Sequence, residues 1–198
     1  RLTKKGNYYF YQDRKFKIKL NTKNVYSKGM FENVCLAIKI ALDLKIDKKV
    51  IQKTLPSLAF EGRFQYLSKG KVKNKLHRNE KIMIDGAHAT ADAKNLAAYL
   101  KSIKIPKYGV WAMSKKKQPD LFIKQLKGVF KKIVTMPIEN ESNSVSANEL
   151  YKVAIKNKFV SEKSKNFEEA LKKISSEEKK LIVCFGSLYN CGNILNKN

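Results

Sequence analysis

The chain has 198 residues, of which 43% are hydrophobic and 10% aromatic, so it can bury a core and global disorder is excluded. No apolar run approaches the roughly 18 to 20 residues of a membrane span, and no charged-then-apolar leader follows the first residue, Arg1. We therefore expect a soluble, cytoplasmic protein with no membrane partner. Three widely spaced cysteines and two histidines indicate neither a disulfide framework nor a zinc site.

The formal net charge is +25, from 42 basic and 17 acidic residues. Such a charge is typical of proteins that bind polyanions. Only four of the basic residues are arginines, however, and the lysines are spread along every segment. Nucleic-acid surfaces favour arginine because its guanidinium binds in a bidentate manner. The composition therefore favours a solvated surface over a nucleic-acid footprint, and we expect no nucleic-acid partner.

The first part of the chain predicts a hairpin or two edge strands, followed by helices. Residues 8–12 and 15–20 are short runs of β-forming residues, and the second run alternates apolar and basic side chains. Residues 29–45 carry apolar residues at helical spacing, and a second short helix is expected over about 47–54, before Pro56.

After residue 60 the pattern alternates between strands and helices. We expect strands at 64–67, 81–84, 108–113, 132–138 and 181–187. Helices are expected over 90–103 with Thr90 as the cap, from Pro119 to about 129, after the capping pairs Ser146/Glu149 and Asn166/Glu169, and in part of the tail after 187. Residues 68–80 are interpreted as a basic loop or hairpin. Continuous apolar strands between amphipathic helices predict an α/β fold with a mostly parallel sheet covered by helices on both faces.

Four residues are candidates for chemistry. Asp85 ends an apolar strand and His88 precedes a helix start, an arrangement suited to binding phosphate or ribose. An ordinary strand-to-helix turn is an equally good interpretation of that pattern. Arg63 lies between a glycine and an aromatic residue, with a surface salt bridge to Glu61 as the alternative role. Asn33 lies in an otherwise apolar helix, where it is either exposed or binds something through its amide.

Several motifs together resemble a known family. The chain contains, in this order, GMFENVCLAIKIAL, EGRFQYL, IDGAHAT, VWAMSKKK and CFGSLYNCGNIL. These motifs resemble the C-terminal part of the bacterial folylpolyglutamate synthase/dihydrofolate synthases, which belong to the Mur ligase superfamily. The resemblance covers essentially the whole chain, and its strongest marks are the DGAH, GRFQ and GSLY elements.

The resemblance implies a ligase that joins L-glutamate to dihydropteroate or folate, using ATP and Mg²⁺ and an acyl-phosphate intermediate. It also implies that Asn33, Arg63, Asp85 and His88 lie at the nucleotide, with Arg63 and His88 nearest the reacting phosphates. It implies an incomplete ATPase domain over 1–58 and a C-terminal domain over 59–198. The apolar faces of the incomplete part, including Tyr9, Phe10 and Val34, are then expected to be partly exposed.

The chain also departs from the family pattern. Ala89 replaces the asparagine of DGAHN, Gly29-Met30 replaces a His-Gln pair, and Lys117-Gln118 replaces a Lys-Asp pair. No P-loop motif occurs in the 198 residues. The resemblance implies that the phosphate cradle and the magnesium ligands lie upstream, so we expect this fragment to be inactive alone. We also expect a monomer. A nucleic-acid-binding α/β domain, another Mur-type ligase and a non-catalytic interaction domain are the alternatives.

Overall fold

The computed structural model describes all 198 residues of the chain. The chain divides into two compact units, Arg1–Phe60 and Glu61–Asn198, which are described separately. No helix in either unit combines the length and the apolar character needed to cross a bilayer.

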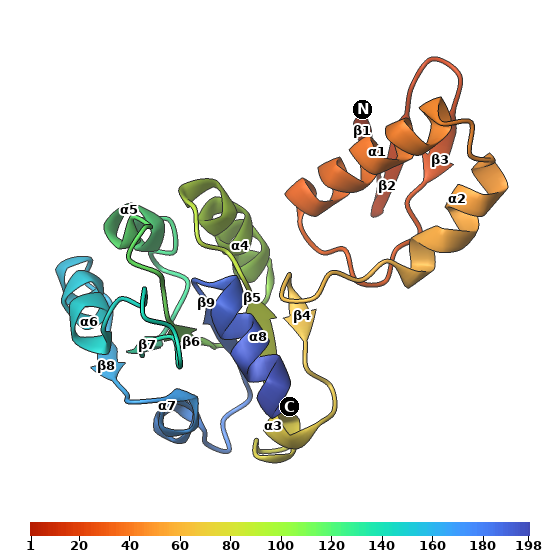
Figure 1. Cartoon of the computed structure of the whole chain (residues 1–198). Coiled ribbons are helices and arrows are strands. Elements are labelled where there is room, and N and C mark those ends of the chain that lie inside the picture. The colour runs from red at the N-terminus through yellow and green to blue at the C-terminus, as the bar shows by residue number, and fades with distance from the viewer. The chain divides into compact units, whose positions relative to one another are not determined.

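The first unit is a small antiparallel sheet with two helices (Figure 1). The elements are β1 (Leu2–Lys5), β2 (Tyr8–Gln12), β3 (Lys17–Lys19), α1 (Lys28–Asp43), α2 (Lys48–Thr54) and the 3₁₀ turn η1 (Leu55–Ser57). The predicted hairpin corresponds to β2 and β3, and β1 is an additional strand that pairs with β2. Ser27 begins α1 because its hydroxyl accepts a hydrogen bond from the Met30 N–H.

The core of the first unit lies between the sheet and α1. Tyr11 and Ile18 of the sheet pack with Phe31, Val34 and Ile38 of α1, and all five are buried. The expectation that Val34 is partly exposed is therefore wrong, because the three-stranded sheet covers that side of the helix.

The second unit contains a six-stranded sheet in the order β4-β5-β9-β6-β7-β8. Its strands are β4 (Gln65–Tyr66), β5 (Glu80–Asp85), β6 (Lys107–Trp111), β7 (Lys132–Thr135), β8 (Ser161–Lys163) and β9 (Lys180–Phe185). Its helices are α3 (Lys71–Asn74), α4 (Thr90–Ser102), α5 (Pro119–Lys124), α6 (Ala147–Lys156), α7 (Phe167–Ile174) and α8 (Leu188–Lys197). All strand pairs are parallel except β4 with β5, so the predicted mostly parallel α/β fold is confirmed.

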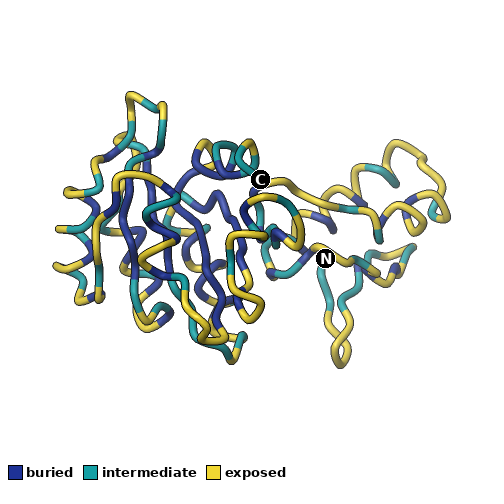
Figure 2. The backbone as a smooth tube through the Cα atoms, turned by 90° about the horizontal axis from the view of Figure 1, so that it is seen from below, coloured by how far each residue is buried: buried dark blue, intermediate teal, exposed yellow.

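Alternate residues along each strand supply the two faces of the sheet. On one face, Ile84 of β5 and Cys184 of β9 pack with residues of α7 and α8 such as Ile174 and Cys191. On the other face, Trp111 and Phe185 stack near Phe122 of α5, with ring centroids 6.0 to 6.4 Å apart. The inner strands of the sheet are largely buried in the trace of Figure 2, and β9 is buried along its whole length.

Several local expectations differ from the structure. Residues 68–80 form no hairpin but contain α3, whose first N–H groups are capped by the backbone and side-chain oxygens of Asn198. Thr90 does not cap α4, because the Asp92 carboxylate reaches back to the N–H of Ala89 at 3.3 Å. The helix that begins at Pro119 ends at Lys124 and continues as turns, and β8 is an unpredicted edge strand.

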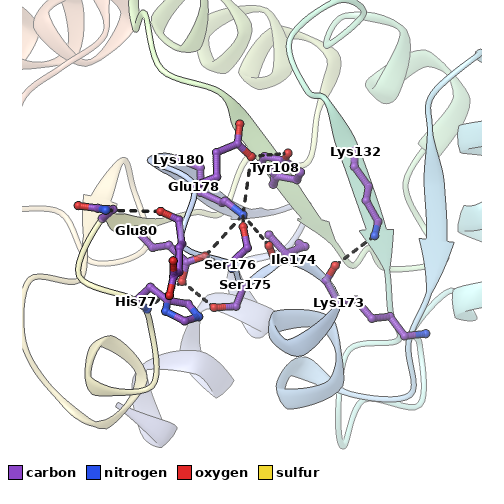
Figure 3. Close-up of polar contacts among 12 residues, drawn as sticks. His77, Glu80, Tyr108, Lys132, Lys173, Ile174, Ser175, Ser176, Glu178 and Lys180 are labelled. Carbon is purple, nitrogen blue, oxygen red and sulfur yellow. Dashed lines mark hydrogen bonds and ion pairs between the residues drawn. The ribbon is translucent and has the colours of Figure 1, made fainter.

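A buried ionic cluster closes the amino-terminal edge of the sheet (Figure 3). Glu80 and Lys180 begin the adjacent strands β5 and β9, and both side chains are inaccessible to solvent. The Glu80 carboxylate accepts hydrogen bonds from the N–H groups of His77 and Ser176 and from the Ser175 hydroxyl. The Lys180 ammonium donates to the Ile174 carbonyl at 2.8 Å and lies 3.7 Å from Glu80. The charged groups of Glu80 and Lys180 thus have partners within the chain. We therefore look for a ligand site at the opposite end of the sheet, where the parallel strands have their carboxyl ends.

Candidate functional site

The carboxyl ends of β5 and β9 form a topological switch point. The chain leaves β5 through α4, whereas it leaves the neighbouring β9 through α8, which packs on the opposite face of the sheet (Figure 1). Open parallel sheets bind ligands in the crevice that such diverging connections create. Asp85 and Gly186 lie at these two strand ends, as the sequence predicted.

Asp85 is buried, with 1% of its surface exposed, and both carboxylate oxygens have backbone partners. One oxygen accepts a hydrogen bond from the Phe64 N–H and the other from the Ala87 N–H, each at 2.8 Å. Burial raises the pKa of the Asp85 carboxyl to about 6, although the two N–H donors and the nearby Arg63 charge act in the opposite direction. Asp85 therefore ties the loop before β4 to the loop after β5.

Arg63 lies in that first loop, on a backbone held in an unusual conformation. Gly62 and Phe64 on either side have positive φ angles of 66° and 48°, and only glycine adopts such a conformation without strain. The Gly86 N–H donates to the Gly62 carbonyl at 2.6 Å, which adds a second link between the two loops. The loop is thus anchored on both sides of Arg63.

The Arg63 side chain is half-buried and makes no hydrogen bond or salt bridge within the chain. The alternative role predicted from the sequence, a salt bridge to Glu61, is not formed. A half-buried guanidinium without a partner is available for an anion, because it offers five donors in a planar arrangement.

His88 lines a small cavity beside the switch point. Its Nδ1 atom lies 2.8 Å from the Gly86 carbonyl, which can only accept, so Nδ1 carries the proton and Nε2 is left for another partner. The cavity has a volume of about 220 Å³ and is lined by His88, Ala89, Thr90, Lys116, Lys117 and Gln118. The sequence motif VWAMSKKK contained these lysines, but nothing in the sequence placed them opposite His88.

Two glycines allow close packing here, Gly86 against α8 and Gly186 against the segment that follows β6. A side chain at Gly86 would collide with Leu188, and a side chain at Gly186 would collide with the Ala112 carbonyl oxygen. Ser187 begins α8 because its hydroxyl accepts from the Asn190 N–H at 3.5 Å. The GSLY element of the sequence therefore lies where the chain packs closely at the carboxyl end of β9.

Asn33 belongs to the first unit, whereas Arg63, Asp85 and His88 belong to the second. Asn33 is exposed on α1 and lines an apolar cavity of about 360 Å³ between α1 and α2. Its amide is one of two polar side chains in the cavity lining, the other being Thr54. A contact of Asn33 with a nucleotide stays a prediction.

The residues fit a nucleotide phosphate better than a metal ion. Arg63 and the two lysines offer donors and positive charge to an anion. The Asp85 oxygens are both engaged, and no cluster of three or more His, Cys, Asp or Glu residues could hold a metal.

Comparison with protein-family models gives a match over residues 68–197 to the dihydrofolate synthetase C-terminal domain. The chain belongs to this family. The match begins after Arg63 and includes Asp85, His88 and the whole switch point. No curated protein matches the chain in a sequence search.

Solved structures of FolC enzymes share the fold of the chain. Escherichia coli FolC in complex with DHPP and ADP matches with a TM-score of 0.80 at 16% identity over 98% of this chain and 44% of that one. Mycobacterium tuberculosis folylpolyglutamate synthase complexed with ADP and AMPPCP gives 0.75 at 15%, over 94% of this chain and 46% of that one. The bifunctional enzyme of Yersinia pestis complexed with AMPPNP and Mn gives 0.75 at 16%, over 95% of this chain and 43% of that one. The chain thus spans less than half the length of these structures.

Proposed function

We propose that the chain is the C-terminal portion of an ATP-dependent ligase that adds L-glutamate to dihydropteroate, to folate or to both. In this proposal residues 1–58 end an ATPase domain and residues 59–198 form the C-terminal wall of the nucleotide site. The protein works in the cytoplasm as a monomer. Support comes from the family match and from the solved structures of similar fold, which are complexes with DHPP, nucleotides, manganese and L-glutamate.

The observation that carries the proposal is the unpaired guanidinium of Arg63 on a loop anchored to Asp85. In the reaction, ATP phosphorylates the carboxylate of the pteroate or folate, and the amine of glutamate attacks the acyl phosphate. Negative charge grows on the transferring phosphoryl group, and a pre-positioned arginine stabilises it without reorganisation. Arg63 then acts on the phosphates, and the imidazolium form of His88 donates its Nε2–H to the same group.

Asp85 has a different part in this proposal. Both Asp85 oxygens accept hydrogen bonds from backbone N–H groups. Asp85 therefore influences nucleotide binding by fixing the loop that carries Arg63, in addition to any contact with the ribose. Asn33 contributes from α1 at the nucleotide. Mg²⁺ neutralises phosphate charge when bound, with ligands that this chain does not supply.

The decisive variant is Arg63→Ala in a polypeptide that joins residues 1–198 to a P-loop domain. An arginine contact made mainly in the transition state is worth roughly 3 to 4 kcal/mol, so kcat is expected to fall about 10²- to 10³-fold. The measurement is ATP-dependent incorporation of labelled glutamate into dihydropteroate and, separately, into folate.

The matched control is Arg78→Ala, which removes an exposed arginine from the loop before β5, at the other edge of the sheet. This variant is expected to keep the rate of the unmodified protein. A rate for Arg63→Ala equal to that of the control would refute the role of Arg63. Glutamate transfer to neither acceptor, with transfer of an amino acid to a different carboxylate, would instead identify another Mur-type ligase.

A further inference from the structure

The sheet of the first unit has one face that packs on α1 and one face turned away from it. Strand pairing places Phe10 opposite Thr3 and Lys19, Tyr8 opposite Lys5, and Gln12 opposite Lys17. Because opposed residues of antiparallel strands share a face, these seven residues form one surface, here called the outer face. The residues between them, including Tyr11 and Ile18, belong to the buried face.

The outer face combines the exposed ring of Tyr8 and the half-buried ring of Phe10 with lysines. Tyr8 is 56% exposed, although a large aromatic side chain usually finds cover in a folded protein. The Lys19 ammonium lies 3.5 Å from the centroid of the Tyr8 ring, and the Lys17 ammonium lies 5.2 Å from that of Phe10. The charges and the rings are therefore held together at the surface.

The surrounding charge is positive and uncompensated. Residues 1–23 include eight basic residues and a single acidic one, Asp13. The Asp13 carboxylate is engaged at the β2–β3 turn, where it accepts hydrogen bonds from the Tyr11 hydroxyl and from the N–H groups of Lys15 and Phe16. No acidic side chain lies on the outer face itself.

We propose that the outer face of the β1–β3 sheet binds single-stranded nucleic acid. Sheet surfaces that bind single strands use aromatic rings on which bases stack and lysines that pair with phosphates. Tyr8 and Phe10 are two residues apart on β2 and can receive neighbouring bases, while Lys5, Lys17 and Lys19 reach the backbone. The overall composition does not reveal this surface, because it depends on which lysines share a face with the two rings.

A simpler role for the lysines is to protect the sheet. β1 and β3 are edge strands, and lysines on edge strands prevent pairing with other chains. That role explains Lys5, Lys17 and Lys19 but not the exposed ring of Tyr8 in the central strand. The two roles differ in what they predict for binding.

The test measures fluorescence anisotropy of a labelled 20-nucleotide oligo(dT) with the 198-residue chain at several salt concentrations. The lysine variant Lys17→Gln/Lys19→Gln is expected to weaken binding and to reduce the slope of log K against log salt by about 1.4, since each phosphate contact contributes about 0.7. Tyr8→Ala is expected to weaken binding roughly 5- to 100-fold, whereas Tyr8→Phe keeps the stacking surface and the affinity. Circular dichroism verifies that each variant is folded.

The control variant is Lys49→Gln/Lys53→Gln, which removes two exposed charges from α2 in the same unit. If it lowers the affinity as much as the lysine variant does, binding is a diffuse effect of the net charge and the proposal is wrong. Equal binding of poly-glutamate and oligo(dT), or unchanged binding by Tyr8→Ala, would also overturn it, because the surface would then accept any polyanion. If oligo(dT) did not bind even at low salt, the proposal would be wrong and protection of the edge strands would be the role of the lysines.

Discussion

At the scale of single residues, Asp85 is the key to the candidate site because it organises backbone rather than presenting a free carboxylate. Its neighbours in space come from two loops, and Phe64 is 21 residues away along the chain. The sequence predicted that Asp85 ends a strand, since an apolar run stops there. It could not predict the Phe64 contact, which depends on a positive φ at a residue other than glycine.

The raised pKa of Asp85 makes a prediction about pH. Burial raises the pKa of Asp85 from its ordinary value of 3.8 to about 6, so protonation of the carboxyl favours the folded state. Its contribution to stability is fully present below about pH 4 and is lost as the pH rises through 6, a change of about 3 kcal/mol. We expect Asp85→Asn to remove this dependence, and also to lower stability by roughly 1 to 3 kcal/mol because its amide group places a donor against a backbone N–H.

Urea unfolding of the 198-residue chain between pH 4 and 7 measures this effect as the difference between unmodified protein and variant. Glu61→Gln, which changes an exposed carboxyl in the same loop, is the control and should keep the pH dependence of the unmodified protein. If Asp85→Asn retained that dependence, the group that titrates near pH 6 would not be Asp85.

At the scale of elements, the sequence predicted the strands and helices that are specified by their own residues, and it missed those that form only by pairing with a neighbour. The strands β5 and β9 were predicted because each contains an unbroken apolar run, residues 82–84 in β5 and residues 181–185 in β9. Helix α6 was predicted because Ser146 and Glu149 form a capping box, and their capping hydrogen bonds are present. The edge strands β1 and β8 have the sequences LTKK and SEK, which carry no strand signal of their own. Their conformation comes from pairing with a neighbouring strand.

The buried Glu80–Lys180 pair allows a prediction at the same scale. Removing one partner leaves a buried charge uncompensated, so Lys180→Met is expected to destabilise the chain by about 3 to 5 kcal/mol. The double variant Glu80→Gln/Lys180→Met should be less destabilised than the sum of the single variants, since it leaves no unpaired charge. Chemical denaturation of the four proteins gives the coupling energy, and strict additivity would show that the pair does not act as a unit.

At the scale of the whole molecule, the two units differ in how well they cover their apolar residues. Leu36 and Ile40 of α1 and Leu44 at its C-terminal cap recur every four residues, and they are 61%, 52% and 71% exposed. Val50 and Phe60 add further exposed apolar surface in the same unit. A repeat at this spacing marks a helix face that is made to pack against something, and the proposed ATPase domain is the partner that would cover it.

Hydrogen exchange tests that arrangement. A unit of sixty residues with an uncovered helix face buries little surface, so amides of α1 and α2 in the 198-residue chain should exchange well before those of β9, which is buried throughout. In the polypeptide that joins the chain to a P-loop domain, exchange in α1 should slow while exchange in β9 stays the same. Equal protection of α1 and β9 in the 198-residue chain would show that the first unit is stable by itself. Protection of α1 that did not change in the longer polypeptide would show that its apolar face packs against something other than that domain.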